Sequence, residues 1–366
     1  MRILIIAPEQ IAVPPPVGGS VEHCIYQIAQ KISPEHSVTI ISKLRRGYPR
    51  TSKLVNITIH RVPSGTSRFY LSHVIAKVKE ENYDLIQIDN RPRFVPAVRQ
   101  AFPHTPISVF LHSTTFISPP MTSVTQANRD FQGANLIVCN SMSLQEHLKK
   151  TFPKHSHKVH YVHLGVDLEQ FRPRQRNSES RPFTIIFAGR LIPKKGIPVL
   201  IKAMHKVRQS VPSARLVIAG GTEKAGYKKS LQALAHSLHV PTTFKGYVPR
   251  IKMPSFYASG DCFVCPSQGH EAFGLVNVEA MASGIPAVAS RNGGIPEIIK
   301  HRENGLLVTN YKDPGALAKE IIAVATEPGL AGKLSRAARE DVLNKFSWRT
   351  TAKKLESLYL SHLGKG

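Results

Sequence analysis

Short apolar runs alternate with longer segments of helical spacing along the first part of the chain. This pattern predicts strands at 2–7, 37–42, 55–62, 84–88, 107–111, 135–139 and 158–162, and helices at 21–31, 70–80, 93–101 and 143–150. Strands that alternate with helices are typical of a parallel sheet covered by helices on both faces. We therefore expect an α/β domain over residues 1–171.

A polar stretch interrupts this alternation. Residues 172–182, RPRQRNSESRP, are charged and bounded by prolines, as in an interdomain linker. The alternation then restarts, with strands expected at 183–188, 214–219, 242–245, 261–265, 287–289 and 306–308, and helices at 198–210, 227–238, 276–282, 314–326 and 330–346. The pattern predicts a second α/β domain at 183–346 and a final helix in 347–366.

Two such domains predict where a ligand would bind. Parallel sheets bind ligands at the carboxyl ends of their strands. If those edges of the two domains face each other, the active site is the cleft between them. The glycine-rich and charged motifs of the sequence do fall just after predicted strands.

Length and composition exclude several classes of protein. With 366 residues the chain exceeds the size at which single cores stop growing, and 42% hydrophobic residues exclude global disorder. No apolar run reaches the roughly 18–20 residues that a membrane span needs. The opening MRILIIAPEQ ends its apolar run at a proline and a glutamate, so we expect a first strand and no signal peptide.

The charge is strongly positive. The sequence has 49 Lys and Arg against 24 Asp and Glu, a net charge of +25, of which +10 lies in residues 1–180 and +15 in residues 181–366. Such a surface attracts phosphates, nucleic acid or an anionic membrane, although it also suits an ordinary basic soluble protein. The segment 43–53, KLRRGYPRTSK, mixes basic and apolar residues, and either a solvated loop or a contact with anionic lipid fits it.

The four cysteines indicate a reducing, cytoplasmic environment, because they are too few for a disulfide framework. Cys262 and Cys265 form a CxxC within an apolar run that reads as a strand. Residues three apart on a strand point to opposite faces, and no second pair completes a zinc set. We expect a core strand, and no metal site.

The densest motif is GHEAFGLVNVEAMASGIP at 269–286, directly after a predicted strand. Gly274 lies where a loop turns into a helix, whose free N–H groups can bind phosphate. Glu271 in the loop and Glu279 on the helix can each accept two hydrogen bonds from sugar hydroxyls. Taken singly, each glutamate could equally be an ordinary solvated side chain.

Other candidate ligand loops also follow strands. In GRLIPKKG, Arg190 and Lys195 could clamp a diphosphate, although a basic loop is often merely solvated. Gly18 and Gly19 could approach a phosphate before a helix begins, and RNGGIPE at 291–297 adds two more glycines. His112 follows the strand at 107–111 and could contact a sugar hydroxyl or simply cap the strand. No Walker or Asp-x-Asp motif occurs, which argues against a metal-dependent sugar-nucleotide site.

Together these motifs resemble the family 4 glycosyltransferases, which are retaining enzymes of the GT-B fold. The resemblance covers nearly the whole chain and is most specific in EAFGLVNVEAMASGIPAVAS, followed by NGGIPEII and ENGLLV. It implies two Rossmann-like domains that face each other across a cleft, with the acceptor in the first and the nucleotide sugar in the second. It also implies that the last helix, in 347–366, returns to the first domain. The Pro-rich opening is similar to that of spore-coat-associated glycosyltransferase-like proteins.

The resemblance implies a role for each motif residue. Arg190 and Lys195 would hold the nucleotide diphosphate and stabilise charge on the leaving group, and Gly19 would approach the same phosphates. Glu271 would contact the donor sugar, and His112 would lie near it. The remaining nucleotide contacts would be the ribose hydroxyls at Glu279, the base near Val248, and the backbone amides of Phe273, Gly274 and Leu275.

The implied activity is a metal-independent transfer of a sugar, without a cofactor. The donor would be a nucleotide-diphosphate sugar, with a UDP-sugar first among them, and the acceptor a cell-surface, spore-coat or lipid-linked glycan or a small molecule. The protein would be cytoplasmic, with contact to the inner membrane face or the spore coat. The alternative is an inactive spore-coat-associated protein that keeps the fold. An epimerase or phosphorylase of the same fold is a third reading, and nucleic-acid binding lacks aromatic or groove-reading motifs.

Overall fold

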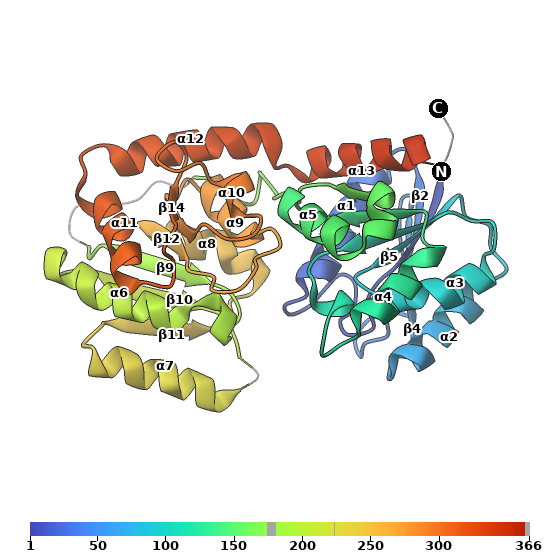
Figure 1. The fold of residues 1–366 in the computed structure, drawn as a ribbon, viewed down its shortest axis with the longest axis horizontal. Coiled ribbons are helices and arrows are strands. Elements are labelled where there is room, and N and C mark those ends of the chain that lie inside the picture. Colours follow the sequence, from blue (N-terminus) through green and yellow to red (C-terminus); the bar gives the residue numbers. More distant parts are fainter. Residues whose placement is uncertain (174–180, 223, 363–366) are drawn as a thin grey trace. The chain divides into compact units, whose positions relative to one another are not determined.

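The computed structural model describes residues 1–173, 181–222 and 224–362, and it divides into two compact units (Figure 1). The first comprises Met1–Leu164 together with Trp348–Gly366, and the second comprises Gly165–Ser347. The predicted first domain ends at 171, whereas the division falls at 164. Most of the predicted linker, residues 174–180, lies outside the described residues.

The first unit is built on an eight-stranded sheet in the order β3-β4-β2-β1-β5-β6-β7-β8. Its strands are β1 (Arg2–Ile6), β2 (Ser37–Lys43), β3 (Thr51–Leu54), β4 (Ile57–Val62), β5 (Leu85–Asp89), β6 (Ile107–Leu111), β7 (Leu136–Cys139) and β8 (Val159–Tyr161). All neighbours pair in parallel except β3, which is antiparallel to β4. The central strands β5, β6 and β7 are buried throughout, as expected for a sheet covered on both faces.

Helices connect these strands. They are α1 (Ser20–Ile32), α2 (Ser67–Val78), α3 (Val95–Ala101), α4 (Val124–Asp130), α5 (Met142–Thr151) and α13 (Trp348–His362), with short 3₁₀ turns η1 (Pro92–Phe94), η2 (Thr115–Ile117), η3 (Phe131–Gly133) and η4 (Pro153–Lys158). Thr66 and Ser141 cap α2 and α5 by accepting backbone N–H bonds through their hydroxyls.

Helix α13 belongs to the first unit, although it is the last helix of the chain. It packs beside α1 (Figure 1). The Trp348 ring meets the His23 ring edge-on at 5.9 Å between centroids. The Tyr359 hydroxyl reaches the Gln87 side chain on β5. Trp348 and Tyr359 are fully buried, so the helix forms part of the core of this unit.

The second unit has a six-stranded parallel sheet in the order β11-β10-β9-β12-β13-β14. Its strands are β9 (Thr184–Ala188), β10 (Arg215–Ala219), β11 (Thr242–Gly246), β12 (Cys262–Cys265), β13 (Ala287–Ser290) and β14 (Leu306–Val308). Its helices are α6 (Ile197–Ser210), α7 (Ala225–Ser237), α8 (Met253–Ala258), α9 (Leu275–Ala282), α10 (Ile295–Ile298), α11 (Pro314–Thr326) and α12 (Leu330–Lys345), with 3₁₀ turns η5 (Pro193–Lys195) and η6 (Arg250–Lys252). Branched aliphatic side chains of the sheet, α6 and α11 form its core.

Most predicted elements are present, and the departures are short ones. The segment 43–53 is not wholly a loop, because Thr51–Leu54 forms β3 and pairs with β4. The predicted strand at 55–62 begins only at Ile57, and the helices α4, α8 and α10 were not anticipated. The CxxC lies on β12 with both thiols buried and unoxidised, which confirms the core strand. Among the described residues, no helix is both long and apolar enough to cross a membrane.

Candidate functional site

Three loops meet at the carboxyl edge of the second sheet. They follow β9, β12 and β13, which are neighbours in the sheet, and they hold residues 189–196, 266–274 and 291–294. The backbone N–H of Gln268 donates to the Lys194 carbonyl at 2.8 Å, and the Asn292 amide donates to the Gly269 carbonyl at 2.8 Å. The three loops are therefore joined by direct hydrogen bonds.

Lys195 and Glu271 form the centre of this edge. The Lys195 ammonium lies 2.5 Å from Glu271 Oε2, and the Ser267 hydroxyl donates to the same oxygen at 2.8 Å. Burial alone would raise the pKa of Glu271, but these two partners hold that pKa below its ordinary value. The structure thus brings together two residues that the sequence separates by 76 positions, as a charged pair.

The loop after β9 is cationic beyond that pair. Arg190 is exposed, and burial together with the charges of Arg190 and Lys195 lowers the pKa of Lys194. Clustered cations of this kind repel one another until an anion neutralises them. A diphosphate bound here would remove that repulsion, and Glu271 offsets only part of it.

Glycines let the loop after β13 lie directly against the backbone of the loop after β12. Gly293 has φ +57, and a side chain there would place its Cβ 2.1 Å from the Glu271 carbonyl oxygen. The N–H of Gly294 donates to that same carbonyl at 2.9 Å. The two predicted glycines at 293 and 294 therefore hold the backbone of Glu271 directly.

Helix α9 begins where the sequence predicted. Gly274 is its N-cap with φ 94 in the left-handed region, and Leu275 is its first residue. Such a start leaves the first N–H groups without helical partners, as a phosphate or hydroxyl site requires. The Phe273 side chain is buried, so only its backbone can face a ligand.

Glu279 has partners that the sequence did not reveal. The Tyr257 hydroxyl donates to its Oε2 at 2.9 Å, and the Arg250 guanidinium lies 2.9 Å from its Oε1. Arg250 also stacks over the Phe171 ring at 5.5 Å. Glu279 is buried, and its hydrogen-bond and ion-pair partners differ from those of Glu271, which are Lys195 and Ser267. Val248 follows β11, which is the edge strand of the sheet.

The first unit places its predicted residues at the carboxyl edge of its own sheet. Gly19 is the N-cap of α1 with φ 68, and a Cβ there would lie 2.8 Å from the Cβ of Pro15. His112 follows β6, and its Nε2 lies 3.0 Å from Asp89 Oδ1 at the end of β5. The His112 ring stacks on Phe110 at 4.6 Å between centroids.

Asp89 belongs to a buried chain of hydrogen bonds. The Gln87 amide donates to its Oδ2 at 2.6 Å, and the Tyr359 hydroxyl of α13 donates to Gln87 Oε1. These hydrogen bonds thus connect α13 to His112. A carboxylate can only accept, so a hydrogen bond between these two side chains requires that the His112 proton be on Nε2.

Two further carboxylates lie in this part of the first unit, and the Oε2 of one of them, Glu22, would lie 3.0 Å from a Cβ at Gly19. Glu9, after β1, forms ion pairs with Arg91 at 2.6 Å and with Arg93 at 2.8 Å. Glu22, in the first turn of α1, is 4% exposed, and its burial raises its pKa to about 7. The sequence shows a carboxyl in the motif GGSVE, but the raised pKa of this group depends on burial that only the fold provides.

Comparisons with known proteins identify the family and the fold. The family described as "Glycosyltransferase Family 4" matches residues 17–170, and the family described as "Glycosyl transferases group 1" matches residues 169–341. The putative glycosyltransferase YtcC of Bacillus subtilis is 29% identical, over 99% of this chain and 93% of that protein. Spore coat protein SA of the same bacterium is 27% identical, over 98% of this chain and 99% of that protein.

Solved structures share the fold. Sucrose-phosphate synthase of Thermosynechococcus elongatus superposes with a TM-score of 0.85 at 21% identity, and covers 100% of both chains. Anabaena Alr3699/HepE, solved in complex with UDP and glucose, superposes with a TM-score of 0.76 at 22% identity, over 99% of this chain and 100% of that one. The predicted fold class, two parallel-sheet α/β domains of the GT-B type, is confirmed.

Proposed function

Since the chain belongs to the family 4 glycosyltransferases, we propose that it transfers a hexosyl group from a nucleotide-diphosphate sugar to an acceptor hydroxyl, with retention of configuration and without a metal ion. A UDP-sugar is the first donor to test, because the structural neighbour Alr3699/HepE was solved with UDP and with UDP-glucose. No cofactor is required, since a diphosphate is already a good leaving group.

The observation that carries this proposal is the ion pair of Lys195 with Glu271 beside an exposed Arg190. In the reaction the bond between the anomeric carbon and the diphosphate oxygen breaks, and a bond to the acceptor oxygen forms on the same face. The acceptor proton passes to the departing phosphate. Arg190 and Lys195 stabilise the negative charge that grows on the diphosphate, which needs cations more than it needs a protein nucleophile.

The remaining residues bind and orient. Glu271 would accept from hydroxyls of the donor sugar, and its low pKa keeps it ionised for that purpose. Glu279, held by Tyr257 and Arg250, would accept from the ribose hydroxyls. The amides around Gly274 at the start of α9 would approach the sugar or phosphate oxygens.

In the first unit, Gly19 would approach the diphosphate, and His112 would present its Nδ1 to a sugar hydroxyl. The base would lie near Val248. The acceptor would bind to this unit, and its class is a cell-surface, spore-coat or lipid-linked glycan. The protein would work in the cytoplasm, in contact with the spore coat or the inner membrane face.

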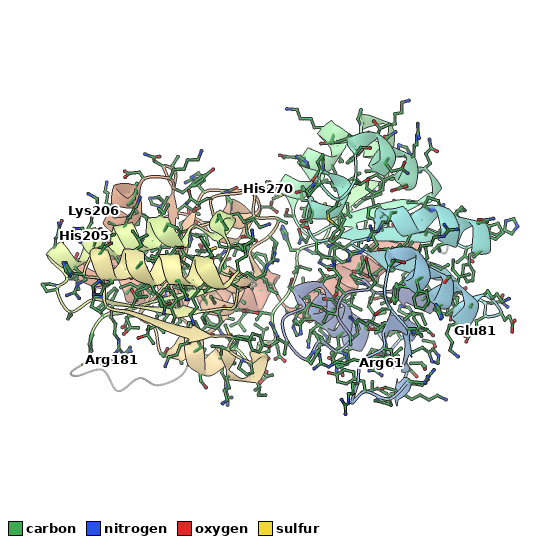
Figure 2. All side chains as sticks on the ribbon, turned by 90° about the horizontal axis from the view of Figure 1, so that it is seen from below. Arg61, Glu81, Arg181, His205, Lys206 and His270 are labelled. Atoms are coloured by element: carbon green, nitrogen blue, oxygen red, sulfur yellow. The ribbon has the colours of Figure 1, made fainter. Side chains whose placement is uncertain are left out.

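Two substitutions test the donor site. With the correct donor and acceptor, Lys195→Ala and Glu271→Gln should each lower sugar transfer about 10²–10³-fold. Lys206→Ala is the matched control, because Lys206 is an exposed lysine on α6 of the same unit (Figure 2). Transfer that is unchanged in both site variants would refute the assignment. A product with inverted configuration, or a rate abolished by EDTA, would refute retention or metal independence.

The second candidate is an inactive coat-associated protein that keeps the fold. The likeness to spore coat protein SA favours it, because that name describes a location and no activity. Thermal unfolding with a panel of nucleotide sugars separates the two. A donor should raise the melting temperature of the second unit, whereas no stabilisation by any nucleotide sugar would favour the coat protein.

A further inference from the structure

One segment of the first unit concentrates basic residues and contains no acidic ones. Residues 36–79 span β2, β3, β4 and α2, and they include nine Lys and Arg but no Asp or Glu. Over the whole chain there is one acidic residue for every two basic ones, so this segment differs clearly from the average. Seven of the nine side chains are exposed: Arg45, Arg46, Arg50, Lys53, Arg68, Lys77 and Lys79.

The turn between β3 and β4 adds exposed apolar side chains to these charges. Leu54 is 40% exposed and Val55 is fully exposed. Val55 also has φ 24, at the first position of a two-residue turn where glycine is usual. A branched apolar residue at a solvent-facing, strained turn is unfavourable in water on two counts, and such strain is a mark of function.

The basic loop before β3 is held in place. Arg61 on β4, labelled in Figure 2, is buried and donates to the Pro49 carbonyl at 2.9 Å and to the Ser52 hydroxyl at 2.8 Å. Its guanidinium also lies over the Tyr48 ring at 5.0 Å. The exposed arginines therefore project from a fixed loop. We call residues 45–55 the β3 edge.

Protection of an open sheet edge explains only part of this surface. Strand β3 ends the sheet, and charged side chains on an end strand prevent pairing with other proteins. That reasoning accounts for Lys53 on the strand itself. It does not account for Leu54 and Val55, whose exposure would favour the aggregation that such charges prevent.

We propose that the β3 edge binds the anionic surface of a lipid bilayer, with Leu54 and Val55 inserted among the headgroups. Each basic residue near such a surface strengthens binding about fivefold, so the four on the β3 edge contribute several hundredfold. A nucleic acid would use the same charges but would leave the apolar turn without a partner. If the proposed transfer reaction is correct, this contact would bring the acceptor-binding unit to a lipid-linked acceptor.

Vesicle sedimentation tests the proposal without any donor or acceptor. The wild-type protein should sediment at low salt with vesicles of phosphatidylcholine containing phosphatidylglycerol, and not with phosphatidylcholine alone. High salt should release it, because charge attraction is screened beyond about 3 Å at 1 M. Replacing Arg45, Arg46, Arg50 and Lys53 by glutamine should weaken binding at least a hundredfold.

A control with the same change in charge removes four exposed lysines of the second unit. These are Lys202, Lys206, Lys229 and Lys245, each replaced by glutamine. This control should lose less than tenfold. Equal losses in the two quadruple variants would overturn the proposal, because binding would then depend on net charge alone.

A third variant separates lipid from other polyanions. Leu54→Ser with Val55→Gly keeps the charge, and it relieves the backbone strain at 55 instead of disturbing the fold. It should weaken vesicle binding about tenfold and leave binding to heparin unchanged. No effect on vesicle binding would refute insertion. Failure of the wild-type protein to sediment would refute the proposal outright, whatever its transferase activity.

Discussion

Replacing Gly196 with alanine should separate the cationic loop from the strand end that carries Glu271. Gly196 ends η5 and caps α6 with φ 73, in the left-handed region. A Cβ at this position would lie 1.9 Å from the Pro266 carbonyl oxygen. Ordinary contact begins at 3.4 Å, so the two loops must move apart by about 1.5 Å.

The magnitude has two parts. The left-handed conformation costs an alanine about 1–2 kcal/mol. Forcing atoms into a packed contact adds about 1–3 kcal/mol, for a total of about 2–5 kcal/mol. Gly329→Ala isolates the first part, because Gly329 also caps a helix of the second unit, has φ 74, and has nothing within 4 Å of its added Cβ. The difference between the two variants is the cost of the close approach.

The assay must follow the second unit. The only tryptophan, Trp348, lies in the first unit, so its fluorescence serves as an internal control. Calorimetry of the second unit should show a loss of about 2–4 °C per kcal/mol. Hydrogen exchange should accelerate in 190–196 and 266–274 for Gly196→Ala alone, and the KM for the donor should rise. Equal destabilisation by Gly196→Ala and Gly329→Ala would refute the close approach of the two loops.

Three other predictions concern single residues. Glu22→Gln should stabilise the protein by about 3 kcal/mol above pH 7 and should have no effect below pH 4.5. Burial raises the pKa of Glu22 in the folded state, so the wild-type protein loses stability as the pH rises between these values, whereas the glutamine variant does not. Parallel curves of unfolding free energy against pH for the two proteins in urea would contradict this. Asp89→Asn should shift His112 away from the tautomer with its proton on Nε2, which the ¹⁵N chemical shifts of the ring report. The rate of sugar transfer should fall while the affinity for the donor is retained. Unchanged ¹⁵N shifts would show that Asp89 does not orient the ring. Arg250→Ala should raise the donor KM about tenfold with a similar kcat, because it removes a charge-assisted bond that holds Glu279. For a donor with 2′-deoxyribose the same substitution should raise the KM much less. Equal increases in KM for both donors would rule out a role at the ribose.

The sequence predicted most strands of the two sheets and the longer helices, because buried strands and amphipathic helices leave a strong periodic pattern of apolar residues. It was insufficient for the hairpin of β3 and β4, because Thr51–Leu54 has one partner strand and only partial burial. Such a strand is specified by its pairing and not by its own alternation. The short helices α4, α8 and α10 were not predicted for a related reason, because helices of one or two turns gain their stability from tertiary packing and not from their own sequence.

The residues of the proposed donor site could be named from the sequence, but the contacts among them could not. Lys195 and Glu271 each lie directly after a strand, so their neighbourhood follows from the parallel order of β9 and β12. The partners of Glu279 come from η6 and α8, two elements that the sequence reading lacked. The same holds for Asp89, whose importance depends on a hydrogen-bonded chain that includes a residue 270 positions later. Pairs of this kind depend on the fold as a whole.

The distribution of charge between the units bears on the whole protein. The first unit has 23 basic and 10 acidic residues, and the second has 26 and 14, so they carry +13 and +12. A nucleotide diphosphate bound by the second unit would explain an excess of cations there and nowhere else. The first unit, which is expected to hold the acceptor, is nevertheless at least as basic. The proposed contact of the β3 edge with an anionic bilayer would account for part of that charge. The acid-free segment 36–79 contributes +9 of the +13, and four of its nine basic residues lie on the β3 edge, so replacing those four should weaken the membrane contact and leave donor binding intact.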